Sequence, residues 1–143
     1  MRTKKSQRGV AAVELALVMI PLVLMAFGIT EFGRAMYQYN TLAKSARQAV
    51  RVMSLAPGNT AEATARCMAV YAKPACGSQD TPVVEGLTAA QVHFVYDTVS
   101  NGVASIPVVR VEIRNFQFVS LMSWVIPDIT FGPIGSTMRQ VGS

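Results

Sequence analysis

An apolar run near the N-terminus constrains this chain most. Residues 10–29 read VAAVELALVMIPLVLMAFGI, twenty residues with one charged side chain, that of Glu14. As an α-helix the run would be about 30 Å long, which matches the hydrocarbon core of a bilayer. Four cations lie in the first nine residues, whereas only Arg34 and Lys44 follow within about fifteen residues of Thr30. The positive-inside rule therefore predicts one membrane span, with the N-terminus in the cytoplasm and the rest of the chain across the membrane.

A secretory signal peptide is the main alternative for this segment, because it also combines a basic start with an apolar middle. Ala26, Phe27 and Gly28 would offer a small-x-small cleavage site. The run is longer than the apolar core of a signal peptide, which has about 7 to 15 residues. It also carries Glu14, and a charge at mid-bilayer costs about 2.5–3.5 kcal/mol, less near the edge. An acidic side chain in this position is therefore expected to have a compensating partner or a functional role.

The net charge of +5 comes largely from the same end of the chain. Without Arg2, Lys4, Lys5 and Arg8, the chain has nine basic and eight acidic residues, so its net charge is close to zero. Nonspecific nucleic-acid binding needs several cations on one face, so we predict no nucleic-acid partner. Catalysis needs several reactive groups that converge on one site. The acids of this chain are scattered, there is a single histidine, and the sequence contains no phosphate-binding glycine loop or metalloprotease motif. We therefore predict no enzyme, no cofactor and no small-molecule substrate.

The spacing of Gly9 and Glu14 suggests a functional role for Glu14. Cleavage after Gly9 would make Val10 the N-terminus and Glu14 the fifth mature residue. This arrangement resembles the class III signal of type IV prepilins, in which a basic leader ends in a glycine at the cleavage site and the mature chain begins with four residues, a glutamate and an apolar run. The resemblance implies that the glutamate offsets the free terminal amine of the same or a neighbouring subunit, and such a pair costs less in low dielectric than either charge alone. An uncleaved anchor with an incidental glutamate is the alternative.

A longer stretch, RGVAAVELALVMIPLVLMAFGITEFGRAMYQYNTLAKSARQAVR at residues 8–51, resembles the N-terminal half of TadE-like minor pseudopilins from tight-adherence pilus systems. The matching positions are Arg8-Gly9, Ala11-Ala12, Glu14, Pro21, Phe27-Gly28, Glu31-Phe32-Gly33-Arg34, Ala46-Arg47 and Ala49-Val50-Arg51. Leu15 departs from the family, where an aromatic residue commonly follows the glutamate. The resemblance implies a structural subunit in the inner membrane, trimmed by a prepilin peptidase. Its implied partners are membrane lipid, other pseudopilins and major pilin subunits, and its implied role is in pilus biogenesis, cell adhesion and biofilm formation.

Beyond Thr30 the pattern becomes amphipathic, with apolar residues at three- and four-residue steps. An unbroken helix over residues 10–53 would be about 66 Å long, bent at Pro21 and ended by residues 56–58. We interpret the stripe as core that packs on the rest of the domain, and the cations between its members, Arg34, Lys44, Arg47 and Arg51, as a solvated face. The stripe comprises Phe32, Ala35, Met36, Tyr39, Leu42, Ala43, Ala46, Ala49, Val50 and Met53.

A second, shorter helix is predicted over residues 60–72, with Asn59 as N-cap and Glu62 as its capping partner. Cys67 and Cys76 are the only cysteines. A disulfide between them would suit a domain in an oxidising compartment. The alternatives are weaker, because two cysteines and His93 fall short of four zinc ligands and the spacing is not that of a CxxC redox motif.

The C-terminal part predicts a small antiparallel sheet. Residues 91–99 and 108–118 are β-prone on either side of a turn at residues 100–102, and the second run alternates apolar and charged side chains. His93 in the first run is expected to be structural or at the surface. Residues 77–86 are expected to form a surface loop, and the apolar tail from residue 121 an edge strand or a draped loop. We interpret Trp124 as a core residue, with a contact to a neighbour or to the membrane interface as the alternative.

Together these patterns predict an α+β protein: a long transmembrane helix whose amphipathic half packs on a small antiparallel sheet, plus a short second helix. The predicted boundaries are a cleaved leader at residues 1–9, a span at 10–30 and an extracytoplasmic domain at 31–143. The favoured function is that of a minor pseudopilin in a tight-adherence pilus. The alternatives are an exported or anchored small binding domain and a pseudopilin of a type II secretion system.

Overall fold

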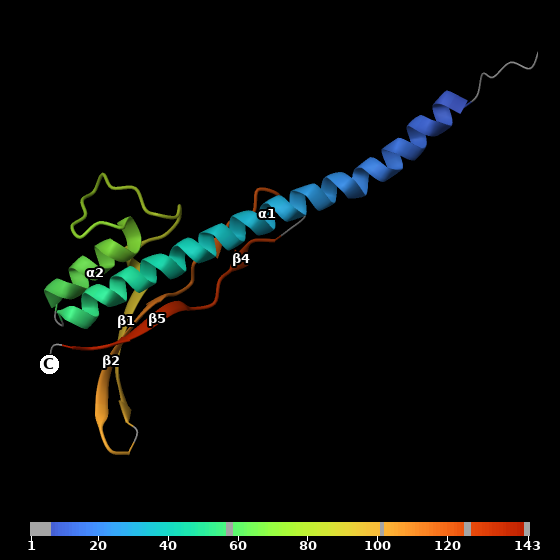
Figure 1. Ribbon diagram of the computed structural model, residues 1–143. Helices are drawn as coiled ribbons and strands as arrows, with labels where there is room; N and C mark the ends of the chain where they lie inside the picture. Colours follow the sequence, from blue (N-terminus) through green and yellow to red (C-terminus); the bar gives the residue numbers. More distant parts are fainter. Residues whose placement is uncertain (1–6, 57–58, 101, 125–126, 142–143) are drawn as a thin grey trace, which may run out of the picture. The chain divides into compact units, whose positions relative to one another are not determined.

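The protein is an α+β structure with a long N-terminal helix, as predicted. The computed structural model describes residues 7–56, 59–100, 102–124 and 127–141, and the chain divides into two compact units, Met1–Ala35 and Met36–Ser143. Its elements, shown in Figure 1, are α1 (Gln7–Leu55), α2 (Asn59–Tyr71), the short 3-10 helix η1 (Ala89–Gln91), β1 (Val92–Ser100), β2 (Ser105–Ile113), β3 (Gln117–Phe118), β4 (Ile129–Thr130) and β5 (Ile134–Arg139).

Several expectations fall outside the described part of the chain. These are the structure of the leader at residues 1–6, the helix-ending pair Pro57-Gly58, the capping side chain of Asn59 and the turn residue Asn101. Helix α1 itself is continuous over 49 residues and passes through Pro21. Helix α2 ends at Tyr71, because Ala72 adopts a left-handed backbone (φ 54°) while its N–H still bonds the carbonyl of Met68 at 3.2 Å.

The core of the larger unit joins both helices to the sheet. The C-terminal half of α1 and a face of alanines spaced four apart on α2 turn inward, which is the spacing of one helical face. Val109, Val111 and Ile113 of β2 are buried against them, as their alternation with Arg110 and Glu112 predicts. The buried helical residues are Leu42, Ala46, Ala49, Val50 and Met53 from α1, and Ala61, Ala65, Ala69 and Val70 from α2.

The main sheet has the order β1-β2-β5 and is antiparallel throughout. Val92 pairs with Ile113 and Ser100 with Ser105 in the predicted hairpin, and Ile134 pairs with Ile113 on the other side of β2. The apolar tail therefore supplies an edge strand, which is one of the two structures expected for it. In Figure 1 this sheet lies against the C-terminal half of α1.

The second predicted strand was too long. It was expected to reach residue 118, but β2 ends at Ile113, because Asn115 adopts a left-handed backbone (φ 57°) that breaks the extended chain. Phe116 and Phe118 beyond this break are both buried. Phe118 belongs to β3, which pairs with β4 as a separate two-stranded sheet, and both rings stack on Phe131 at centroid distances of 5.9 and 6.2 Å.

Two predictions about the core were wrong in part. The apolar stripe of α1 is buried from Leu42 onward, but Phe32, Met36 and Tyr39 are exposed, so the stripe extends beyond the part of the helix that packs as core. Trp124, interpreted as a core residue, has 80% of its surface exposed. Hydrophobicity alone does not bury a side chain, since a large fraction of any protein surface is apolar.

Candidate functional site

The first candidate site is the apolar surface of α1 in the unit Met1–Ala35. Its large hydrophobic side chains are exposed all round the helix, from Val10 to Ile29. Within the described residues, α1 is a helix long and apolar enough to cross a membrane, and none of its most apolar window is buried by the protein. A soluble protein rarely exposes so large a continuous apolar surface, so this helix fits a single-pass membrane anchor.

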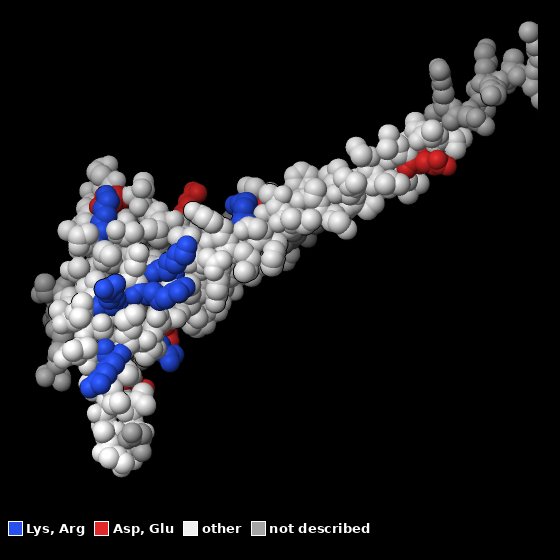
Figure 2. Space-filling model, in the orientation of Figure 1, with Lys and Arg blue, Asp and Glu red and all other residues white. Residues whose placement is uncertain are grey.

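Gly9, Val10 and Glu14 lie on one turn and a half of this exposed helix. The peptide bond after Gly9 lies in the first turns of α1, and a Cβ added to Gly9 would meet no heavy atom of another part of the chain within 4 Å. Val10 and Glu14 are four residues apart, so they share a face of the helix about 6 Å apart along its axis. Figure 2 shows the N-terminal part of the helix as an almost uncharged surface, consistent with Glu14 being the single charge of residues 10–30.

An ion pair follows directly after the apolar run. Arg34 Nη1 lies 2.9 Å from Glu31 Oε1, three residues earlier on the same helix. Thr30 donates its hydroxyl to the carbonyl of Ala26 at 2.9 Å, so it satisfies its own polar group within the helix. Both residues of the pair belong to the sequence pattern Glu31-Phe32-Gly33-Arg34, but the pairing itself was not predicted. The i,i+3 spacing of opposite charges is the signal that could have found it.

The cations predicted to form a solvated face behave as expected in the larger unit. Lys44, Arg47 and Arg51 are exposed on α1, and Arg47 donates to the carbonyl of Ala43 at 3.1 Å. Basic side chains gather on this unit in Figure 2. Arg34 differs from the other three, since it is half-buried and paired with Glu31.

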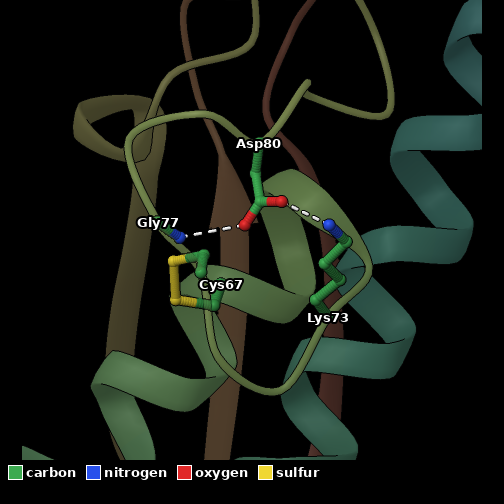
Figure 3. Close-up of a disulfide and its surroundings, with 5 residues drawn as sticks. Cys67, Lys73, Gly77 and Asp80 are labelled. Carbon is green, nitrogen blue, oxygen red and sulfur yellow. Dashed lines mark hydrogen bonds and ion pairs between the residues drawn. A yellow bond between two sulfur atoms is a disulfide. The ribbon is translucent and has the colours of Figure 1, made fainter.

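The disulfide predicted between Cys67 and Cys76 is present in the structure, with Cα atoms 5.5 Å apart. It ties the loop after α2 to the last turns of that helix. Figure 3 shows the Asp80 carboxylate beside it, bound to the Lys73 ammonium and to the N–H of Gly77 at 2.9 Å. The hydrogen bond from Lys73, together with that from Gly77, lowers the pKa of the Asp80 carboxyl. This loop is therefore closed by the Cys67–Cys76 disulfide and by the ion pair between Lys73 and Asp80.

Removing the disulfide should destabilise the domain measurably. A double Cys67→Ala and Cys76→Ala variant should lose about 3 kcal/mol of unfolding free energy, because the unfolded chain regains the entropy of a closed loop of about ten residues. Urea titration of the full chain in detergent, followed by near-ultraviolet circular dichroism, measures the loss. Ser78→Ala changes an exposed side chain in the same loop and should leave the midpoint unchanged. Equal midpoints for the double variant and the parent chain would show that the bridge contributes nothing.

Polar contacts hold α2 on β1. Arg66 donates to the carbonyls of Ala89 and Val92 at 2.7 and 3.1 Å and lies 5.1 Å from the centroid of the Phe94 ring. Tyr96 donates its hydroxyl to Glu62 at 2.5 Å. Burial, and then the Glu62 carboxylate, raise the pKa of Tyr96 to about 12. These contacts position the second helix and bring together no catalytic set.

The outer face of the sheet carries a satisfied charge cluster. Glu112 lies between Arg110 and Arg114 at 3.2 and 2.7 Å, and the hydrogen bond from Arg114 lowers the pKa of its carboxyl most. Gly135 on β5 leaves the space for this side chain, since a Cβ there would lie 3.0 Å from Glu112 Cγ. His93 is exposed on β1, and no metal-binding group of His, Cys, Asp or Glu occurs among the described residues.

The fold and the exposed helix together define a small α+β domain carried on a candidate membrane anchor. Residues 9–51 of this chain match the family described as TadE-like protein, which confirms the resemblance found for residues 8–51. The family is associated with tight-adherence pili, in which it is a structural component. Comparisons with curated proteins and with solved structures give no match.

Proposed function

We propose that this chain is a minor pseudopilin of a tight-adherence pilus, a structural rather than a catalytic subunit that contributes to pilus biogenesis and, through the filament, to adhesion and biofilm formation. The observation that carries the proposal is the placement of Glu14 five residues after Gly9 on a helix whose apolar surface is exposed all round. The match of residues 9–51 to the TadE-like family supports it.

The proposed path from synthesis to assembly begins with insertion into the cytoplasmic membrane. Residues 10–30 span it with the N-terminus inside, a prepilin peptidase removes residues 1–9, and residues 31–143 fold on the far side. The disulfide supports this placement, because such bonds persist in oxidising compartments. The freed ammonium of Val10 then compensates Glu14 of the same or a neighbouring subunit when the helices gather with other pseudopilins and the major pilin.

The mature N-terminus tests this proposal directly. Intact mass and N-terminal sequencing of the membrane-extracted protein should show loss of residues 1–9. Gly9→Leu should abolish this trimming, because a bulky side chain keeps the backbone from a close approach to the peptidase. Gly28→Leu is the matched control: Gly28 lies on the same helix with open space around it, so this variant should be trimmed normally.

The other mass outcomes point to other functions. Loss of residues through Gly28 would indicate a conventional signal peptide and an exported binding domain, and a full-length chain would indicate a plain anchor. Either result contradicts the pseudopilin proposal. A pseudopilin of a type II secretion system would be cut at the same bond, so the subunits captured by crosslinking in the native membrane must separate that case.

A further inference from the structure

The connection between β3 and β4 exposes three large apolar side chains in succession along one turn. Val119, Leu121 and Trp124 have 62%, 73% and 80% of their surfaces exposed. Residues 119–124 contain no charged side chain. Exposed aliphatic and aromatic groups gathered on a small domain indicate an interaction surface more often than they indicate an ordinary solvated loop.

This turn is held in shape by buried polar contacts. Ser120 is buried, and its N–H donates to Asp128 Oδ1 at 3.1 Å. Its hydroxyl oxygen accepts the N–H of Met122 at 3.1 Å. Because the polar residue points inward and is satisfied there, Leu121 and Trp124 are presented outward by a built turn.

Two contacts within the unit Met36–Ser143 show how the chain after this turn runs along α1. The N–H of Val141 donates to the carbonyl of Ser54 at 2.9 Å, near the C-terminal end of α1. The ring of Phe131 meets the ring of Tyr39 edge to face at a centroid distance of 5.8 Å, near the start of this unit. The chain from Phe131 to Val141 therefore runs antiparallel to α1, and Phe131 lies at the level of Tyr39, near the start of this unit.

Tyr39 belongs to the part of α1 that follows the proposed membrane span in the sequence. Tyr39 lies nine residues beyond Thr30, about 14 Å along the helix axis. Phe131 comes seven positions after Trp124, and an extended chain of that length reaches up to about 23 Å. The helix length from Thr30 to Tyr39 and the chain length from Phe131 to Trp124 therefore allow Trp124 to reach the headgroup layer.

We propose that residues 119–124 are a membrane-interface anchor, in which Leu121 and Trp124 enter the headgroup region of the membrane that α1 spans. This inference rests on the proposed membrane placement of α1. Tryptophan suits the interface because its ring is apolar while its indole N–H finds a polar partner among the headgroups. A second contact of this kind would restrain the domain relative to the membrane before the subunit joins a filament.

Trp124 reports on this contact directly, because it is the single tryptophan of the chain. The full-length protein, trimmed or untrimmed, is reconstituted into phosphatidylethanolamine–phosphatidylglycerol vesicles. We expect its fluorescence to shift to shorter wavelength relative to the protein unfolded in urea, to be quenched by lipids brominated near the top of the acyl chain, and to resist iodide.

The matched control moves the fluorophore to the other end of the sheet. In the Trp124→Phe, Val103→Trp variant the tryptophan occupies the turn after β1, where Val103 is 94% exposed. The pairing of Ile134 with Ile113 and of Arg139 with Val108 puts this turn at the end of the hairpin away from Phe131. This variant should be quenched by iodide and untouched by bromolipid.

The outcomes separate this inference from the proposed function. Flotation of the vesicles shows whether α1 anchors the protein. A floating protein whose Trp124 is as open to iodide as the control overturns the interface anchor and leaves the pseudopilin proposal standing. A shifted emission that ignores bromolipid and disappears on dilution with lipid also overturns it, and indicates a neighbouring subunit as the occupant. A protein that fails to float overturns the membrane placement and the interface anchor together.

Discussion

Glu14→Ala should leave the protein fully inserted in the membrane but nearly absent from filaments. Insertion is not impaired, because removing a carboxylate from an apolar helix lowers the cost of placing that helix in lipid. Assembly is impaired, because the ammonium of Val10 then loses the charge that compensates it between packed helices. Breaking a buried pair by removing one partner costs about 3–5 kcal/mol, roughly a hundredfold or more in an association equilibrium.

The measurement compares sheared filaments with the membrane fraction by quantitative immunoblot. Leu15→Ala is a suitable control, because Leu15 is an exposed apolar neighbour on the same helix and its truncation removes no charge. Glu14→Asp should restore part of the incorporation, since it keeps the carboxylate with a shorter reach. Wild-type amounts of the alanine variant in filaments would contradict the role proposed for Glu14.

Phe116→Ala should give the largest loss of stability among single substitutions in the larger unit. Phe116 is 1% exposed and stacks on Phe131, which in turn meets Tyr39 of α1. Truncation leaves a cavity between the segments that carry these rings, and buried Phe→Ala changes cost about 3–5 kcal/mol. Urea denaturation of the full chain in detergent measures the effect.

Phe32→Ala is the matched control for this prediction. It removes the same atoms from α1, but Phe32 is 68% exposed, so the change in stability should stay within about 0.5 kcal/mol. Similar unfolding midpoints for the two variants would mean that the aromatic cluster does not support the domain.

The local patterns of the chain predicted most elements correctly. A run of twenty residues with a single charge indicated the N-terminal part of α1, and the alternation of Val109, Arg110 and Val111 indicated β2. These predictions rest on periodicity, which reflects how successive side chains point along a helix or a strand. Gly9, Val10 and Glu14 were singled out by their spacing and by the resemblance to prepilins, and their role in processing stays a prediction.

The errors arose where long-range packing decides the outcome. The alternation of residues 108–118 predicted one long strand, whereas Asn115 takes a left-handed conformation, which asparagine adopts more readily than most residues, and β2 ends five residues early. The apolar stripe of α1 extends from Phe32 to Met53, but the inward face of the sheet and α2 cover it only from Leu42 onward. Trp124 was interpreted as a core residue, whereas the inward position in that turn belongs to Ser120.

The amino-acid sequence by itself determined the long apolar helix, the carboxylate near its start, the strand pattern and the pairing of two cysteines, because each depends on residues close together in the chain. Only the tertiary structure decided which apolar side chains are covered and which face outward, because burial depends on contacts between segments far apart in the chain. The exposed turn of Leu121 and Trp124 is such a feature, because the structure buries Ser120 there and leaves the two large apolar side chains exposed.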